Sequence, residues 1–213
     1  YGADVHTVDG PRDLATIEAV SYSKRLNLPY SFHGLSPYFL EGNKKFAYET
    51  AHWFDNVLPD HIVFPVGNGG LFLGAWKGFN ELLAAGFISD LPRLHAVQSK
   101  SFMPLVAAHQ ALDWTQDQSG KTIASGIAVK WPARMQQLLD ALCLTHGEAV
   151  AVEDKEILRW HNLLAMREGI YAEPTSVVAF AGLNKLVRRG VIEGGEKVMI
   201  PITGSGLKDA ISG

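Results

Sequence analysis

The chain of 213 residues holds 19 lysines and arginines against 22 aspartates and glutamates, which gives a formal net charge of −3. This balance lacks the basic surplus of proteins that bind nucleic acid or an acidic membrane surface, so neither partner is expected. With 47% hydrophobic and 19% charged residues, the composition is that of a globular protein with enough apolar material for a core. No apolar run reaches the roughly 18 residues of a membrane-spanning helix.

The cysteine and histidine content bears on the cellular compartment and on metal binding. The chain has one cysteine, Cys143, in the apolar run LLDALCLT. A single cysteine forms no internal disulfide and is typical of a reducing compartment, so we expect a cytoplasmic protein with Cys143 as a small core residue. The eight histidines show no metal-ligand spacing, so no metal site is expected.

The hydrophobic pattern predicts strands that alternate with helices. The predicted strands are residues 5–8, 61–66, 92–98, 148–152 and 197–203. The predicted helices are residues 13–27, 43–54, 134–144, 155–169 and 176–190, with one more that carries Trp76 and ends at Gly86. A loop is expected at residues 28–42 and a mobile loop at residues 113–121.

Several of these strands are continuous apolar runs, which is typical of strands that are buried on both sides. We therefore predict an α/β fold of three layers, an open and mostly parallel sheet with helices on both faces. His95 lies inside one of the strands and is expected to be a core histidine. Because the chain begins inside a predicted strand, we expect the fold to be incomplete at its N-terminus.

Two glycine-rich segments follow predicted strands, GNGG at residues 67–70 and TGSG at residues 203–206. Ligands of parallel sheets bind beyond the carboxyl ends of the strands, so we expect both segments to face one pocket. The first segment leads into a helix, whose unpaired N–H groups and positive dipole end favour an anion such as phosphate. A tight turn that needs glycine for its backbone alone is the alternative.

The GNGG segment departs from two common phosphate-binding patterns. A P-loop requires Lys and then Ser or Thr after GxxxxG, whereas Ala-Trp-Lys follows Gly74. A dinucleotide fingerprint requires GxGxxG, whereas Phe72 stands at its last glycine. The residues alone therefore leave the class of phosphate ligand open.

Six segments taken in order resemble the fold-type II pyridoxal-phosphate (PLP) enzymes, with threonine synthase and threonine-synthase-like proteins as the nearest by pattern. The segments are PVGNGG, WKGF, PRLHAVQ, TIASGIAVKWP, EGIYAEPTSVVAFAGLNKL and IPITGSGLKD. SPYFLEGNKKFAYE is also similar to the stretch that precedes the phosphate-binding strand in that family. The resemblance covers nearly the whole chain and implies a tryptophan synthase β-like fold.

This resemblance implies a set of PLP-binding residues. The backbone N–H groups of GNGGL would wrap the phosphate, which involves Gly67, Asn68, Gly69, Gly70 and Leu71. Thr203 would place its hydroxyl beside the pyridine nitrogen, where a hydroxyl makes the ring a more moderate electron sink than a carboxylate does. The alternative for Thr203 is a side chain that satisfies its own turn.

The resemblance also implies substrate-pocket residues, namely Ser125, Glu173 and Ser176. A helix cap is an equal explanation for Ser176 and its neighbour Thr175. Ser36 and Tyr38 stand in the SPYFLEG segment and are weaker candidates for contact with substrate, because a packed loop explains them better.

The lysine that forms the Schiff base with PLP lies, in this family, in a segment ahead of everything seen here. Lys24, in Ser21-Tyr-Ser23-Lys24, imitates its motif, but it stands on a polar helix face after a strand that the family places downstream of the lysine. We therefore assign no catalytic residue in this chain. Residues 1–30 are expected to be the end of a smaller N-terminal domain and residues 31–213 part of the large PLP-binding domain, and the fragment alone is expected to be inactive.

The resemblance implies a PLP-dependent lyase of amino-acid metabolism that acts as a homodimer. Threonine synthase, of threonine biosynthesis, converts O-phosphohomoserine to threonine and phosphate. Its typical pattern has an arginine shortly after the equivalent of Ser125, where this chain has Gly126-Ile127-Ala128, and it has TGHG in place of TGSG. Threonine or serine dehydratase-type β-elimination is therefore one alternative, and a non-catalytic relative that binds PLP is another.

Overall fold

The computed structural model describes residues 1–10, 12–115 and 120–208. Within them, four parallel strands form one sheet in the order β3-β2-β1-β4. The strands are β1 (His61–Pro65), β2 (Arg93–Ser99), β3 (Ala149–Val152) and β4 (Val198–Met199). The predicted mobile loop at residues 113–121 lies partly outside the described residues.

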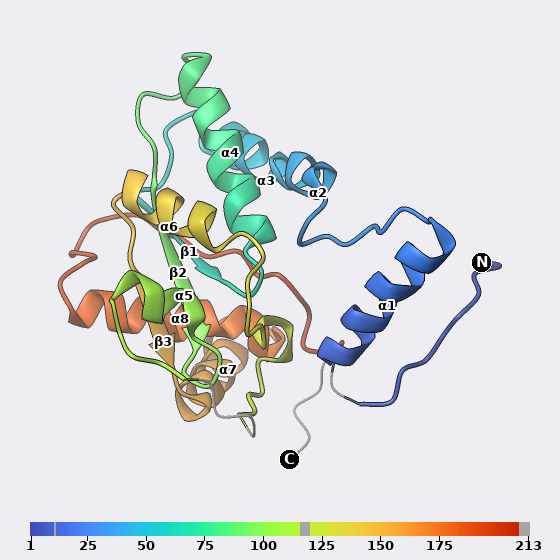
Figure 1. The fold of residues 1–213 in the computed structure, drawn as a ribbon. Helices are drawn as coiled ribbons and strands as arrows, with labels where there is room; N and C mark the ends of the chain where they lie inside the picture. The colour runs from blue at the N-terminus through green and yellow to red at the C-terminus, as the bar shows by residue number, and fades with distance from the viewer. Residues whose placement is uncertain (11, 116–119, 209–213) are drawn as a thin grey trace.

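Helices connect the strands and flank the sheet (Figure 1). They are α1 (Arg12–Leu26), α2 (Pro37–Asn43), α3 (Lys45–Trp53), α4 (Gly70–Ala84), α5 (Pro104–His109), α6 (Met135–Leu144), α7 (Asp154–Glu168) and α8 (Pro174–Arg188), with a short 3₁₀ turn at Ser125–Ile127. None of the helices in the described part of the chain is both long enough and apolar enough to cross a membrane.

The sheet is covered on both faces, which confirms the predicted three-layer α/β architecture. Alternate strand residues such as Phe64 and Leu94 pack with α3, α4, α5 and α6 in one hydrophobic cluster. Their neighbours Val63 and Val97 point the other way and pack with α7 and α8 in a second cluster. Because side chains alternate across a strand, a continuous apolar run fills both cores at once.

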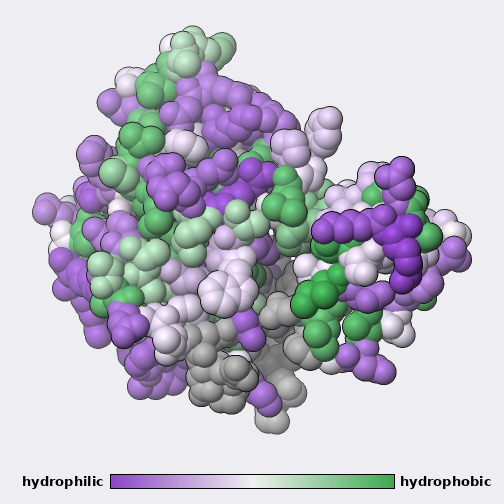
Figure 2. All heavy atoms as spheres, in the orientation of Figure 1, coloured by the Kyte–Doolittle hydropathy of each residue, from purple (hydrophilic) through white to green (hydrophobic). Residues whose placement is uncertain are grey.

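The N-terminal residues differ from the sequence prediction. No strand forms at residues 5–8, where Val5 is 83% exposed, so that prediction is wrong. Alternation alone does not make a strand, because a strand needs a neighbour to pair with. The helix α1 lies apart from the sheet and its covering helices, and green hydrophobic surface is exposed on the lobe that it forms (Figures 1 and 2). A domain boundary after residue 30 stays a prediction.

Three further predictions need correction. The expected loop at residues 28–42 contains α2, which Pro37 opens at a position where a missing N–H costs nothing. The last strand stops at Met199, because Pro201 has no N–H to offer to a neighbouring strand. Cys143 is exposed rather than buried, since α6 turns Leu138, Ala141 and Leu142 toward the core.

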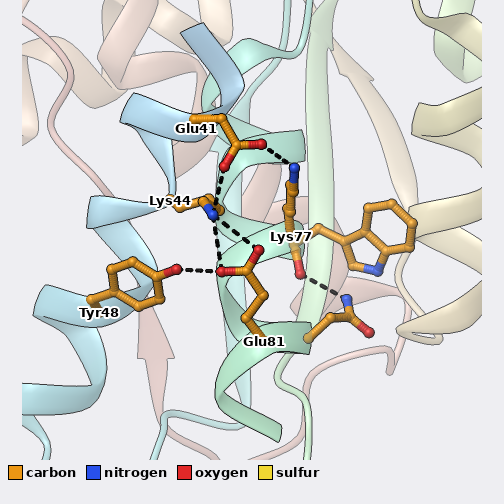
Figure 3. Close-up of polar contacts among 7 residues, drawn as sticks. Glu41, Lys44, Tyr48, Lys77 and Glu81 are labelled. Atoms are coloured by element: carbon orange, nitrogen blue, oxygen red, sulfur yellow. Dashed lines mark hydrogen bonds and ion pairs between the residues drawn. The ribbon is translucent and has the colours of Figure 1, made fainter. Parts of the chain in front are cut away.

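Polar side chains hold α2 and α3 against α4 (Figure 3). Lys44, between α2 and α3, lies 2.6 Å from Glu41 and 2.9 Å from Glu81 of α4. Glu41 also pairs with Lys77, and Tyr48 donates a hydrogen bond to Glu81. The Tyr48 and Lys44 hydrogen bonds lower the pKa of Glu81. The network fixes the helix pair along the second half of α4.

Gly74 of α4 packs closely against Asn43, the last residue of α2. A β-carbon at Gly74 would lie 2.9 Å from the carbonyl carbon and 3.1 Å from Cα of Asn43. Alanine normally stabilises a helix interior by about 1 kcal/mol relative to glycine. We expect Gly74→Ala to do the opposite and lower the free energy of unfolding by about 1–3 kcal/mol, because the added methyl overpacks the contact. Urea unfolding of the full-length protein measures the change.

Gly42 in α2 provides the matched control, since a β-carbon there meets no atom within 4 Å. Gly42→Ala is expected to leave the unfolding free energy unchanged or to raise it by up to about 1 kcal/mol. If both substitutions stabilise the protein equally, the close approach at Gly74 is not a constraint on the fold.

Candidate functional site

The turn between β1 and α4 combines an unusual backbone with an open helix end. Gly69 is the residue that caps α4, and it has φ = 76°, a left-handed conformation that glycine adopts at no steric cost. No side chain caps the first turn of this 15-residue helix. Its first N–H groups have no intrahelical partners and carry the positive end of the helix dipole, so the turn can bind an anion.

A second segment passes directly over this turn. A β-carbon at Gly67 would lie 3.1 Å from Cα of Ile127 and 3.2 Å from the carbonyl oxygen of Gly126. Gly126 N–H donates to Thr175 Oγ1 at 3.1 Å. The Ser125–Ile127 turn is therefore held between the glycine turn and the N-terminus of α8, which brings three distant segments to one point.

A buried glutamine fixes the residue that enters the glycine turn. Gln98 of β2 is 0% exposed, and its Nε2 donates to the carbonyl oxygen of Val66 at 3.1 Å. Its Oε1 accepts the N–H groups of Leu105 and Val106, at 2.9 and 3.2 Å, from the start of α5. Both the amide nitrogen and the amide oxygen of Gln98 are engaged, so Gln98 ties the end of β1 to α5 and limits movement of the turn.

The TGSG segment reaches the same place from β4. Ser176, in the first turn of α8, is 0% exposed, and its Oγ lies 2.9 Å from Thr203 Oγ1. Gly204 N–H donates to the same Ser176 Oγ at 2.9 Å, and Glu173 N–H donates to the carbonyl oxygen of Gly204 at 3.0 Å. These bonds fasten the segment after β4 to the N-terminus of α8.

These segments surround a cavity of about 310 Å³ at the carboxyl edge of the sheet. Its lining consists of His33, Asn43, Pro65, Gly67, Asn68, Gly69, Gly70, Leu71, Phe72, Gly126, Ile127, Glu173, Thr175 and Thr203. A second cavity of about 350 Å³ adjoins it, and Asn68 lines both. In the described residues no group of three or more histidines, cysteines, aspartates or glutamates is placed to hold a metal ion.

Most of the residues singled out from the sequence come together at this cavity. The glycine turn from Gly67 to Leu71, Thr203 and Glu173 all line it, and Glu173 is only 8% exposed. Ser176 lies behind Thr203 rather than on the lining. Ser125 opens the turn whose next two residues line the cavity, but is not on the lining itself. Their contact with substrate stays a prediction.

Lys24 does not belong to either cavity. It is exposed in the last turn of α1 and lines neither of them. This position agrees with its interpretation as an imitation of the lysine motif.

Sequence reasoning missed His33 and Asn43, which line the cavity from the segment before β1. His33 Nε2 lies 3.5 Å from Asn68 Nδ2, and a β-carbon at Gly70 would lie 3.4 Å from Asn43 Nδ2. The sequence had pointed instead to Ser36 and to Tyr38, which is 82% exposed. The similarity of SPYFLEGNKKFAYE to a family segment marked the region, but only the helical path of α2 turns Asn43 inward.

A model of the family described as pyridoxal-phosphate dependent enzymes matches residues 1–204. The chain belongs to this family. Its members use PLP as cofactor, so PLP is the cofactor that the site must accommodate. The site fits PLP at its phosphate end, because the turn offers unpaired N–H groups and lacks side chains at three of its four positions.

Curated relatives give a more specific similarity. The chain is 37% identical to threonine synthase of Methanocaldococcus jannaschii over 211 residues, which is 98% of this chain and 52% of that protein. It is 34% identical to threonine synthase of Bacillus sp. strain ULM1, over 98% of this chain and 57% of that protein. The chain thus spans about half the length of the curated relatives it matches.

Solved structures with the same fold include other enzymes. The processed form of threonine deaminase isoform 2 from Solanum lycopersicum matches with a TM-score of 0.75 and 18% identity, over 96% of this chain and 53% of that chain. Maize serine racemase matches with a TM-score of 0.75 and 16% identity, over 96% and 59%. At these identities the structures bear on the fold alone.

Proposed function

We propose that the protein is a PLP-dependent carbon–oxygen lyase of threonine biosynthesis, similar to threonine synthase, which forms threonine and phosphate from O-phosphohomoserine. The observation that carries the proposal is the anion-binding turn from Gly67 to Leu71, in a chain that is 37% identical to a threonine synthase over 98% of its length. Bound PLP supplies an electron sink for bond cleavage at the substrate's α-carbon.

The residues of this chain would hold the cofactor and exclude water from it. The N–H groups of the glycine turn would bind the phosphate, and Thr203 would meet the pyridine nitrogen. Glu173, Ser125 and Ser176 would shape the substrate side, Ser176 from its place behind Thr203. The covalent lysine is not assigned to any residue of this chain, and the exposed Lys24 is not proposed for that role.

A second candidate is β-elimination from threonine or serine. The described lining of the cavity of about 310 Å³ contains no lysine or arginine, and Glu173 brings a carboxylate to it. A substrate phosphate needs cationic partners, whereas threonine and serine carry no phosphate. Lys130 lines the adjoining cavity. Among the described residues that line the two cavities, it is the one lysine or arginine.

Turnover by the full-length protein with PLP distinguishes these reactions. Incubation with O-phosphohomoserine is expected to release phosphate and threonine in equal amounts. Incubation with threonine is expected to yield no 2-oxobutyrate. Release of 2-oxobutyrate without phosphate release would replace the first candidate by the second.

Borohydride reduction followed by peptide mass spectrometry tests whether the protein is a catalyst at all. An enzyme is expected to retain a pyridoxyl group on one lysine, and Lys24→Arg is expected to leave that label in place. A protein that binds PLP but is never labelled would be a non-catalytic relative, and label on Lys24 would overturn its exclusion.

The proposal includes a small amino-acid substrate, a cytoplasmic location and a homodimer. The single cysteine, exposed on α6, agrees with a reducing compartment. Sedimentation of the purified full-length protein tests the dimer, and cell fractionation tests the location.

A further inference from the structure

Thr203 lines the cavity and also contacts Ser176, which lies behind it. In the described part of the chain, Ser176 Oγ, at 2.9 Å, is the hydrogen-bond partner of Thr203 Oγ1. Either oxygen can donate across this contact. The direction of this one bond decides whether Thr203 presents a hydrogen or only a lone pair to a ligand.

The other bonds of Ser176 set that direction. Its Oγ accepts the N–H of Gly204 at 2.9 Å, so this contact uses a lone pair and leaves the hydroxyl hydrogen to be placed. The hydrogen has two acceptors in reach, Thr203 Oγ1 at 2.9 Å and the carbonyl oxygen of Gly204 at 3.5 Å. The carbonyl is at the limit of hydrogen bonding and already accepts Glu173 N–H at 3.0 Å.

Because Ser176 is buried, its hydroxyl hydrogen needs an acceptor within the protein. Ser176 is 0% exposed, so water does not satisfy its hydroxyl, and a buried donor without a good acceptor is costly. The shorter contact to Thr203 satisfies it. The two hydrogen bonds then have the same direction: Gly204 N–H donates to Ser176 Oγ, and the Ser176 hydroxyl donates to Thr203 Oγ1.

We propose that Ser176 is a positioning residue that orients the Thr203 hydroxyl, so that the Thr203 hydrogen points into the cavity as a donor. This inference rests on the proposed function, in which Thr203 meets the pyridine nitrogen of PLP. The ring nitrogen must then accept a hydrogen bond and therefore lacks a proton of its own. Ser176 would govern this state without touching the cofactor.

A double-mutant cycle in the full-length protein tests the proposal. Ser176→Ala is expected to weaken PLP binding roughly 2- to 10-fold, the range for loss of one oriented hydrogen bond. The same change in a Thr203→Val background is expected to have a clearly smaller effect on PLP affinity, because no hydroxyl remains to orient and only the loss of the Gly204 hydrogen bond is left. In a Thr203→Ser background, which keeps the hydroxyl, the full effect should return.

A spectroscopic readout separates orientation from a merely structural role. The ¹⁵N chemical shift of ring-labelled PLP is expected to move in Ser176→Ala and to stay unchanged in Thr145→Val. Thr145 is the matched control, since its buried Oγ1 also accepts a backbone N–H, that of Leu94 at 3.3 Å, and donates to Ala141 at 2.7 Å.

The failures of the two proposals can be told apart. A Ser176→Ala effect of equal size in the wild-type and Thr203→Val backgrounds, or an unchanged ¹⁵N shift, would overturn the orienting role alone. A wild-type protein that binds no PLP would overturn the proposed function and this inference with it.

Discussion

Gly69→Ala is expected to weaken PLP binding by about tenfold or more. Gly69 has a left-handed backbone that costs an L-residue roughly 1–2 kcal/mol, and a tenfold change in affinity corresponds to about 1.4 kcal/mol. A β-carbon there would also overlap the side chain of Leu138 in α6. Relief of the strain and the overlap must rotate the N–H groups that we propose to bind the phosphate. Fluorescence titration of the full-length protein with PLP measures the affinity.

Gly86→Ala separates backbone strain from damage to the site. Gly86 follows the C-terminus of the same helix with φ = 73°, and a β-carbon there meets no atom within 4 Å. The alanine variant should lose stability to a comparable backbone strain while its PLP affinity stays that of the wild type. Equal losses of PLP affinity in the two variants would mean that the turn at Gly69 has no special part in binding.

The second large effect is a loss of stability in mild acid that depends on His95. His95 and His61 are both 0% exposed, on adjacent strands, with His61 Nδ1 2.9 Å from His95 Nε2. His95 Nδ1 accepts the N–H of Glu148 at 3.0 Å, so its hydrogen is on Nε2 and the ring is neutral. Burial, with the nearby His61 and Arg93, lowers the pKa of His95 to about 3.

The sign of the effect follows from proton linkage. In the unfolded chain this histidine titrates near 6.5, so below that pH the unfolded state binds a proton that the folded state does not. The stabilisation is complete above pH 6.5 and is lost as the pH falls toward about 3. The titration of His95 alone should therefore lower the free energy of unfolding by about 2 kcal/mol when the pH falls from 7 to 5.

Urea unfolding of the full-length protein at several pH values tests this dependence. The wild type is expected to show the acid-dependent loss, and His95→Gln is expected to lack the His95 part of it, although it is less stable at neutral pH. His52→Gln, at an exposed position on α3, should keep the wild-type slope. An unchanged slope in His95→Gln would show that His95 is not the group that titrates.

The parallel sheet and its glycine turn could be predicted because their causes are local in sequence. The apolar run at β1, the glycines after it and the start of α4 are consecutive, so one stretch of chain holds the whole signal. The cores on both sheet faces follow from the same run, since alternate residues point to opposite sides. The strand pattern placed Thr203 at the end of the last predicted strand, whereas its role beside the pyridine nitrogen came from family resemblance.

The remaining features depend on contacts between distant segments. Neither the pattern around Ser176 nor that around Thr203 indicates that the two hydroxyls meet at 2.9 Å. Asn43 faces the cavity because α2 and α3 dock on α4 through Lys44 and Glu81. At residues 5–8 the local pattern predicted a strand, but among the described residues no neighbouring strand pairs with it and no strand forms.

The pairing of β1 with β4 has a consequence for the order of events during synthesis. The bond from Lys197 N–H to Asp60, beside this pairing, joins residues 137 positions apart, and Thr203 follows only after β4. The glycine turn leaves the ribosome long before the segment that closes the opposite wall of the cavity. A nascent chain therefore lacks the Thr203 side of its binding pocket until β4 and the segment after it have been made, and complete cofactor capture must wait for that segment.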